Sequence, residues 1–203
     1  MNNDLYTVLR RIGRGYLFLH FHIRIGTLDL LPDWLGYYWI LLGIWALAKE
    51  IPSAVRLEPF AIGMTAWCLF SWIVKIFGGQ LEGSLVSLVV TAVTLYLHFQ
   101  LLTDIGILAD NFGCSEGETL RRLRVVYAVC NGLSLLGLLP LGVETQSGLV
   151  IVLSVLTIIV VIRLVLVLRR LSCAITEIPV PLGISDYVQP EPEEVPEPEE
   201  ENQ

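Results

Sequence analysis

The sequence predicts an all-α protein, a polytopic transmembrane helical bundle with six membrane segments. Two observations predict this class. Hydrophobic residues make up 54% of the 203 residues, and the mean hydropathy is +0.67. These residues gather in long apolar blocks separated by short polar stretches, and a helix needs only about 20 such residues to cross a hydrocarbon core roughly 30 Å thick. A soluble domain of this length has no use for so many blocks.

The predicted segments follow one another with little chain between them. They lie near residues 9–30, 34–49, 57–77, 82–109, 120–141 and 147–172. Together they make residues 1–176 one transmembrane helical domain. The first segment is the least suited to crossing, because His20, His22 and Arg24 interrupt it. Five spans preceded by an interfacial helix are therefore the alternative to six spans.

Basic residues predict the orientation of the bundle, since cytoplasmic loops carry an excess of Lys and Arg. Two helix ends are marked in this way, by Arg121, Arg122, Arg124, Arg169 and Arg170. The loop 142–147 between those helices has no basic residue. We therefore expect the loop near 110–122 and the C-terminus on the cytoplasmic side of a plasma membrane. With six spans, the N-terminus lies there too.

Residues 177–203 differ from the rest of the chain. They hold nine of the 20 acidic residues and none of the 13 basic residues, so the remainder carries 11 acidic residues and a net charge of +2. Proline alternates with glutamate toward the end, a composition that cannot build a core. We expect a disordered acidic Pro/Glu-rich tail. It is either a solvated segment with no partner or a cytoplasmic docking segment for a basic protein.

One predicted helix carries a polar stripe. Its members recur at intervals of three and four residues and are Ser84, Ser87, Thr91, Thr94 and His98. Residues at this spacing share one face of a helix. Such a face either packs closely against a neighbouring helix or lines a polar path whose ionisable member is His98. Thr91, Thr94 and His98 are the candidate residues of that path.

Three further polar residues lie within predicted membrane segments. Asp104 follows His98 by six residues, about 600° of helical rotation, so we expect it away from the stripe and nearer Gln100. Asn131 is expected to hydrogen-bond across a pair of helices. Arg163 lies near the cytoplasmic end of its segment, where its long side chain either reaches the interface or pairs with an acidic residue of another helix.

Asp29, Asp33 and Trp34 mark an expected outer-face hairpin between the first two segments. Pro32 suits the first turn of a helix, and an acidic residue beside it interacts favourably with the helix N-terminus. Trp34 begins a cluster of aromatic residues typical of a membrane interface. An aromatic binding surface is the alternative interpretation.

The sequence contains no recognisable catalytic, cofactor or metal motif. Nucleophile, Walker, dinucleotide and zinc-protease patterns are missing, and the four cysteines are scattered singly. His20 and His22 point to different sides of a helix and do not suit one metal ion. The basic residues flank membrane segments and give no support for nucleic-acid binding. We predict no cofactor, no metal and no enzymatic activity.

The N-terminal region resembles a known group of proteins. Residues 15–19 read Gly-Tyr-Leu-Phe-Leu, and residues 31–38 read Leu-Pro-Asp-Trp-Leu-Gly-Tyr-Tyr. The second stretch is similar to a Leu-Pro-Asp-aromatic-x-Gly-Tyr sequence found near the N-terminus of uncharacterised multi-pass membrane proteins of Gram-positive bacteria. The resemblance is confined to this region. It implies a bacterial plasma membrane and implies no activity.

These observations favour an integral plasma-membrane protein that is a non-enzymatic accessory or interaction protein. Membrane lipid surrounds it, and a cytoplasmic protein is the expected partner of its acidic tail. The alternative is a small transporter or membrane sensor whose polar path ends at His98. The two interpretations differ in where the function lies, on the tail in the first and in the interior in the second.

Overall fold

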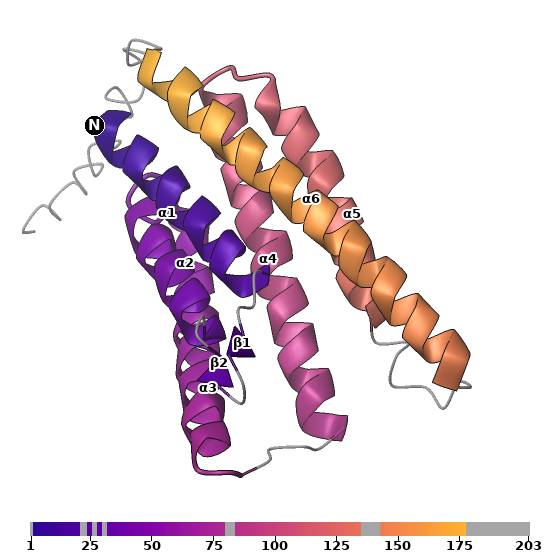
Figure 1. Ribbon diagram of the computed structural model, residues 1–203. Helices are drawn as coiled ribbons and strands as arrows, with labels where there is room; N and C mark the ends of the chain where they lie inside the picture. Colours follow the sequence, from indigo (N-terminus) through magenta and orange to yellow (C-terminus); the bar gives the residue numbers. More distant parts are fainter. Residues whose placement is uncertain are drawn as a thin grey trace, which may run out of the picture.

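The computed structural model describes residues 2–20, 24–25, 28–29, 32–79, 84–134 and 143–177. Its elements are α1 (Asn2–His20), β1 (Arg24–Ile25), β2 (Leu28–Asp29), α2 (Asp33–Leu47), the 3-10 helix η1 (Pro52–Leu57), α3 (Glu58–Ile76), α4 (Ser84–Asn111), α5 (Glu116–Ser134) and α6 (Val143–Glu177). The described residues confirm the all-helical prediction, apart from the two-residue strands. The long helices form an elongated bundle with the N-terminus and the C-terminal end of α6 at the same end (Figure 1). Of the expected acidic tail, all but Glu177 lies outside the described residues.

Three described stretches of helix are long and apolar enough to cross a membrane. They are Pro52–Ile76, which joins η1 to α3, Leu85–Asn111 of α4 and Ile151–Thr176 of α6. Six membrane segments are therefore not confirmed. α2 has only 15 residues, which at about 1.5 Å per residue is shorter than a hydrocarbon core of roughly 30 Å. Charged residues interrupt α1 and the first turns of α5.

The predicted first segment, residues 9–30, is wrong in its bounds. α1 begins at Asn2 and ends at His20, and β1 and β2 then pair antiparallel, with Arg24 opposite Asp29. A prediction from apolar content did not include the first turns of α1. The buried residues there are spaced three or four apart and are separated by polar residues. Such an amphipathic pattern marks a helix with one buried face.

Glycines bring α1 and α2 into close contact. The helices are antiparallel, with Gly15 of α1 against Gly36 of α2. Further along, Ile12 lies against Gly43. A Cβ atom on Gly15 would lie 2.8 Å from the Gly36 carbonyl oxygen and 2.6 Å from Ile40 Cγ1, too close for any side chain. Small residues at a crossing let helix backbones approach in this way, so α1 is seated directly on α2.

The core lies where α1 crosses the other helices. α1 packs between α2 and α6, and α4 packs on α5 (Figure 1). Fully buried apolar side chains come from each of these helices and include Leu9, Ile12, Ile44, Leu101, Ile105, Leu120 and Leu164. A second set of large apolar side chains is exposed to the surroundings on α3 and the first half of α4: Phe60, Ile62, Phe70, Ile73, Leu85, Val86, Leu88 and Val89. An apolar surface of this extent suits a lipid environment.

A tight turn makes α4 and α5 antiparallel neighbours. Gly113 has a φ angle of +67°, a left-handed conformation that glycine adopts without steric cost. The Cys114 N–H donates to the Ala109 carbonyl oxygen at 2.9 Å and so satisfies one of the last carbonyl groups of α4. Across the turn, the Arg121 guanidinium pairs with the Asp110 carboxylate.

Candidate functional site

His98 of α4 lies at the centre of a cluster of aromatic rings. Its side chain is buried, and the ring centroids of Tyr16 of α1, Tyr37 of α2 and Tyr127 of α5 lie 5.1, 5.9 and 5.5 Å from its own. Tyr16 and Tyr127 also meet edge to face, with centroids 6.0 Å apart. Four helices thus contribute one ring each to what we call the Tyr–His cluster, comprising these four residues. Aromatic contacts of this kind stabilise a fold by more than the apolar surface area that they bury.

Hydrogen bonds engage the tyrosine hydroxyls of the cluster and Nδ1 of His98. His98 Nδ1 lies 3.0 Å from the Tyr16 hydroxyl oxygen, and one of these two groups donates to the other according to the histidine tautomer. The Tyr37 hydroxyl lies 3.3 Å from the Thr94 hydroxyl of α4. A buried polar group is costly unless it is hydrogen-bonded. These bonds offset that cost and tie α1 and α2 to α4.

His20, at the end of α1, extends the network to α5. Its Nδ1 lies 3.0 Å from the Tyr16 carbonyl oxygen, which can only accept, so Nδ1 carries the proton. In the neutral ring Nε2 is then an acceptor, and it lies 3.4 Å from the Tyr127 hydroxyl. On α5 itself, the Asn131 side-chain amide donates to the Tyr127 carbonyl oxygen at 2.9 Å. The two histidines are therefore linked through tyrosines of two helices.

The structure brings together only part of the predicted polar stripe. Thr94 and His98 lie in or against the Tyr–His cluster. Thr91 Oγ1 donates to the Ser87 carbonyl oxygen of its own helix at 2.8 Å, and Ser87 is exposed. The side chain of Ser84 lies outside the described residues. The five residues share a helix, but the described side chains divide between its outer surface and the interior.

The tyrosines of the cluster were missed by sequence reasoning. Tyr16 and Tyr127 are single tyrosines near apolar residues, and Tyr37 belongs to the aromatic cluster that begins at Trp34. A tyrosine in either setting is as expected at a membrane interface as in a core. The Tyr16–His98 hydrogen bond joins residues 82 positions apart. Local spacing contains no signal for such a pair.

Asp104 forms a separate polar contact on α4. Its carboxylate is fully buried and accepts from the Ser53 hydroxyl of η1 at 2.8 Å and from the Gln100 side-chain amide at 3.0 Å. The second carboxylate oxygen has no hydrogen-bond partner among the described residues. As expected from the helical rotation, Asp104 associates with Gln100 and not with His98. It fastens η1 to α4 at the end of the bundle that holds the N-terminus.

The other candidate residues lie apart from the cluster. Arg163 is exposed on α6, and no described carboxylate pairs with it. Asp29 lies in β2, and Asp33 begins α2. The Trp34 ring centroid lies 6.4 Å from that of Trp72 on α3. Beside them is a cavity of 210 Å³, whose lining includes Asp33, Trp72 and Lys75. Trp72 and Lys75 lie in the C-terminal half of α3, and Asp33 lies one helical turn before Tyr37 on α2.

The thiols and carboxylates are dispersed. Cys68, Cys114, Cys130 and Cys173 are free thiols. Burial raises the pKa of the Cys114 thiol in the α4–α5 turn, and the nearby Glu116 carboxylate adds to the rise. A thiol with a raised pKa is a weaker nucleophile at neutral pH. Within the described ranges, no group of three or more His, Cys, Asp or Glu residues is placed to hold a metal ion.

No family model matches the chain, and no curated protein or solved structure shows significant similarity to it.

Proposed function

We propose that the chain is an integral protein of a bacterial plasma membrane that acts without catalysis, as an accessory or interaction protein. In this proposal the bundle is an anchor, and the acidic tail is a cytoplasmic docking segment for a basic partner. The tail has nine acidic residues and no basic ones. It follows α6 directly, so a partner bound to it stays close to the basic end of the bundle.

The observation that supports this proposal is that the polar interior is used to hold helices together. Tyr16, Tyr37 and Tyr127 surround His98, and their polar atoms bond to one another or to Thr94 and His20. Satisfied buried networks of this kind make a fold rigid and specific. Because these side chains bond to one another, the cluster favours a structural role for the interior. The function is then expected on the surfaces of the protein.

The distribution of charge supports cytoplasmic positions for both termini. The N-terminus and the end of α6 lie at one end of the bundle, together with the α2–α3 and α4–α5 connections (Figure 1). Near these points the chain carries Arg10, Arg11, Lys49, Arg56, Arg121, Arg122, Arg124, Arg169 and Arg170. Arg24 of β1 follows the C-terminal end of α1, and Lys75 lies in the last turn of α3. Both are therefore at the opposite end of the bundle (Figure 1). An excess of Lys and Arg is typical of the cytoplasmic side.

Photo-crosslinking in native membranes tests the proposal. The partners of the full-length protein are compared with those of a variant that ends at residue 176. A second variant keeps the tail but replaces its glutamates with glutamine, which separates charge from length. We expect a specific cytoplasmic protein to be captured by the full-length chain and lost from both variants. The same proteins captured from all three would remove the tail from the function.

A further inference from the structure

Three arginines from two helices line one groove. Arg10 and Arg14 of α1 and Arg169 of α6 border a space of 290 Å³ between these helices. All three residues are exposed, and no carboxylate in the described part of the chain pairs with any of them. The groove therefore concentrates positive charge that nothing described here neutralises.

Aromatic rings hold two of these arginines in place. The Arg10 guanidinium carbon lies 5.3 Å from the centre of the Tyr6 ring, and Arg10 Nη1 donates to the Tyr6 hydroxyl at 2.8 Å. The Arg14 guanidinium carbon lies 5.8 Å from the centre of the Trp39 ring on α2. Each guanidinium has five N–H donors, so contacts of this kind leave most of them available to a ligand.

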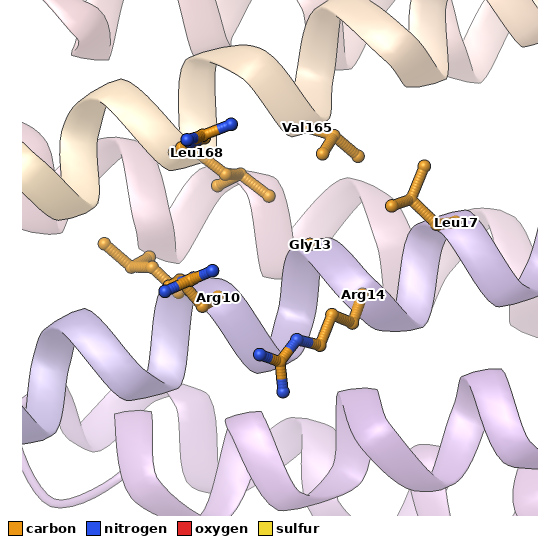
Figure 2. A pocket seen from close by; sticks show the side chains of 8 residues that line it. Arg10, Gly13, Arg14, Leu17, Val165 and Leu168 are labelled. Atoms are coloured by element: carbon orange, nitrogen blue, oxygen red, sulfur yellow. The ribbon is translucent and has the colours of Figure 1, made fainter.

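The rest of the groove is apolar. A Cβ atom on Gly13 would lie 3.9 Å from Val165 Cγ1 and 4.0 Å from Leu168 Cδ1, so the glycine leaves the floor of the groove open. In Figure 2, Arg10 and Leu168 lie toward one end, and Leu17 and Val165 lie toward the other. Leu17 follows Arg10 by seven residues, about 10 Å along a helix. Arg10 and Arg169 therefore border the end of the groove beside Leu168, and Leu17 and Val165 border the other end. Arg14 lies between them on α1, and its side chain extends toward Trp39 of α2 (Figure 2).

We propose that this groove binds an anionic phospholipid, with the phosphate at Arg10 and Arg169, the positive charge of Arg14 beside them, and an acyl chain along Leu17 and Val165. Guanidinium groups recognise phosphate oxygens through paired N–H donors. The inference rests on the membrane location and orientation proposed above, which place this end of the bundle at the cytoplasmic leaflet, where anionic lipids lie. A free phosphate ion would match the arginines but would leave the apolar half of the groove unfilled.

Lipid retention by the full-length protein tests the site. The protein is purified in a neutral detergent, titrated with phosphatidylglycerol and followed by native mass spectrometry. The variant R10Q/R14Q/R169Q removes the charges of the groove. The matched variant K49Q/R122Q/R170Q removes three positive charges from the same end of the bundle, outside the groove. We expect the groove variant to lose affinity for phosphatidylglycerol by about tenfold or more and the matched variant to change little.

A steric variant keeps every charge and tests the apolar half. Gly13→Leu fills the floor of the groove, and we expect it to weaken phosphatidylglycerol binding while the net charge of the protein is unchanged. Phosphatidylcholine, which has a phosphate but no net charge, is expected to bind weakly to the unmodified protein. Two arms separate the lipid from a free anion: Gly13→Leu, and competition by excess inorganic phosphate.

Several outcomes would overturn the inference. Equal losses from the two triple variants would mean that the lipid follows the general charge of the surface. Displacement of the lipid by inorganic phosphate, with full binding retained in Gly13→Leu, would assign the arginines to a soluble anion. Equal binding of phosphatidylcholine would remove the anionic site. None of these results bears on capture of a partner by the tail, so failure here and failure of the docking function are distinguishable.

Discussion

α1 and α3 are opposite in composition and opposite in burial. Pro52–Ile76, which includes α3, is apolar enough to cross a membrane, yet only 11% of its most apolar window is buried. α1 carries Arg10, Arg11 and Arg14, yet Leu9, Ile12 and Tyr16 on its other face are fully buried. One of the two least apolar helices thus supplies much of the interior, and one of the most apolar supplies surface.

The difference teaches that apolar content and burial are separate quantities in this molecule. Lipid is as apolar as a leucine side chain, so it gives helices no hydrophobic reason to associate. Close packing and hydrogen bonds must hold them instead, and α1 has both, through Gly15 and through Tyr16. α3 has few contacts of this kind. Substitutions on α1 should therefore be costly and substitutions on the exposed face of α3 cheap.

Tyr16→Ala should have the largest effect on the stability of the bundle. It removes a fully buried ring and leaves His98 Nδ1 without its partner, and truncation of a buried aromatic side chain costs about 3–5 kcal/mol. The free energy of unfolding is measured by titrating the purified protein in micelles with sodium dodecyl sulfate. Tyr38→Ala is the control, because Tyr38 is exposed on α2. Equal effects of the two substitutions would contradict the role given to the Tyr–His cluster.

Gly15→Leu should part α1 from α2. The added side chain collides with Gly36 and Ile40, and overpacking of a close contact costs about 1–3 kcal/mol. The same micelle titration measures it. Gly63→Leu on α3 is the matched control, since nothing lies within 4 Å of a Cβ atom there. A loss of stability at Gly63 as large as that at Gly15 would mean that α3 has packing partners that its exposure does not suggest.

Ser53→Ala tests the link between η1 and α4. It removes the hydroxyl that donates to the buried Asp104 carboxylate, and a buried acceptor that loses a donor costs about 1–2 kcal/mol. Ser87→Ala, on the exposed side of α4, is expected to change the free energy of unfolding very little. In an Asp104→Leu background, where the acceptor is absent, Ser53→Ala should have little further effect, and that result would sharpen the assignment. Failure of Ser53→Ala to destabilise the protein would dismiss it.

Ile73→Leu should have the smallest effect, within about 0.5 kcal/mol. Ile73 is exposed on α3, and a change of apolar shape at a lipid-facing position alters no specific contact. Ile44→Leu at a fully buried position of α2 is expected to cost about 1 kcal/mol under the same conditions. A larger loss at Ile73 than at Ile44 would break the comparison, because it would require another protein surface against α3.

The sequence by itself determined the helices that are strongly apolar. Helices occur near the predicted segments 34–49, 57–77 and 82–109, because long apolar runs between polar turns are a local property of the chain. Gly113 follows the end of α4 because of another local property, the left-handed conformation that glycine adopts without steric cost. The bounds of α1 were not predicted correctly. One face of this helix is apolar and buried, but its charged face lowers the mean hydropathy of the segment. The spacing of Thr94 and His98 puts both on one face of α4, where Thr94 meets Tyr37 and His98 meets Tyr16.

Tertiary structure alone decided what those residues meet. Nothing near His98 in the chain indicates that Tyr16, Tyr37 and Tyr127 surround it, because the partners come from three other helices and a single tyrosine in an apolar run has several equally good environments. The same holds for the groove, where Arg169 joins Arg10 and Arg14 only because α6 packs on α1. Periodicity is set within a helix, but the choice of neighbour depends on shape and hydrogen bonding between helices far apart in the chain.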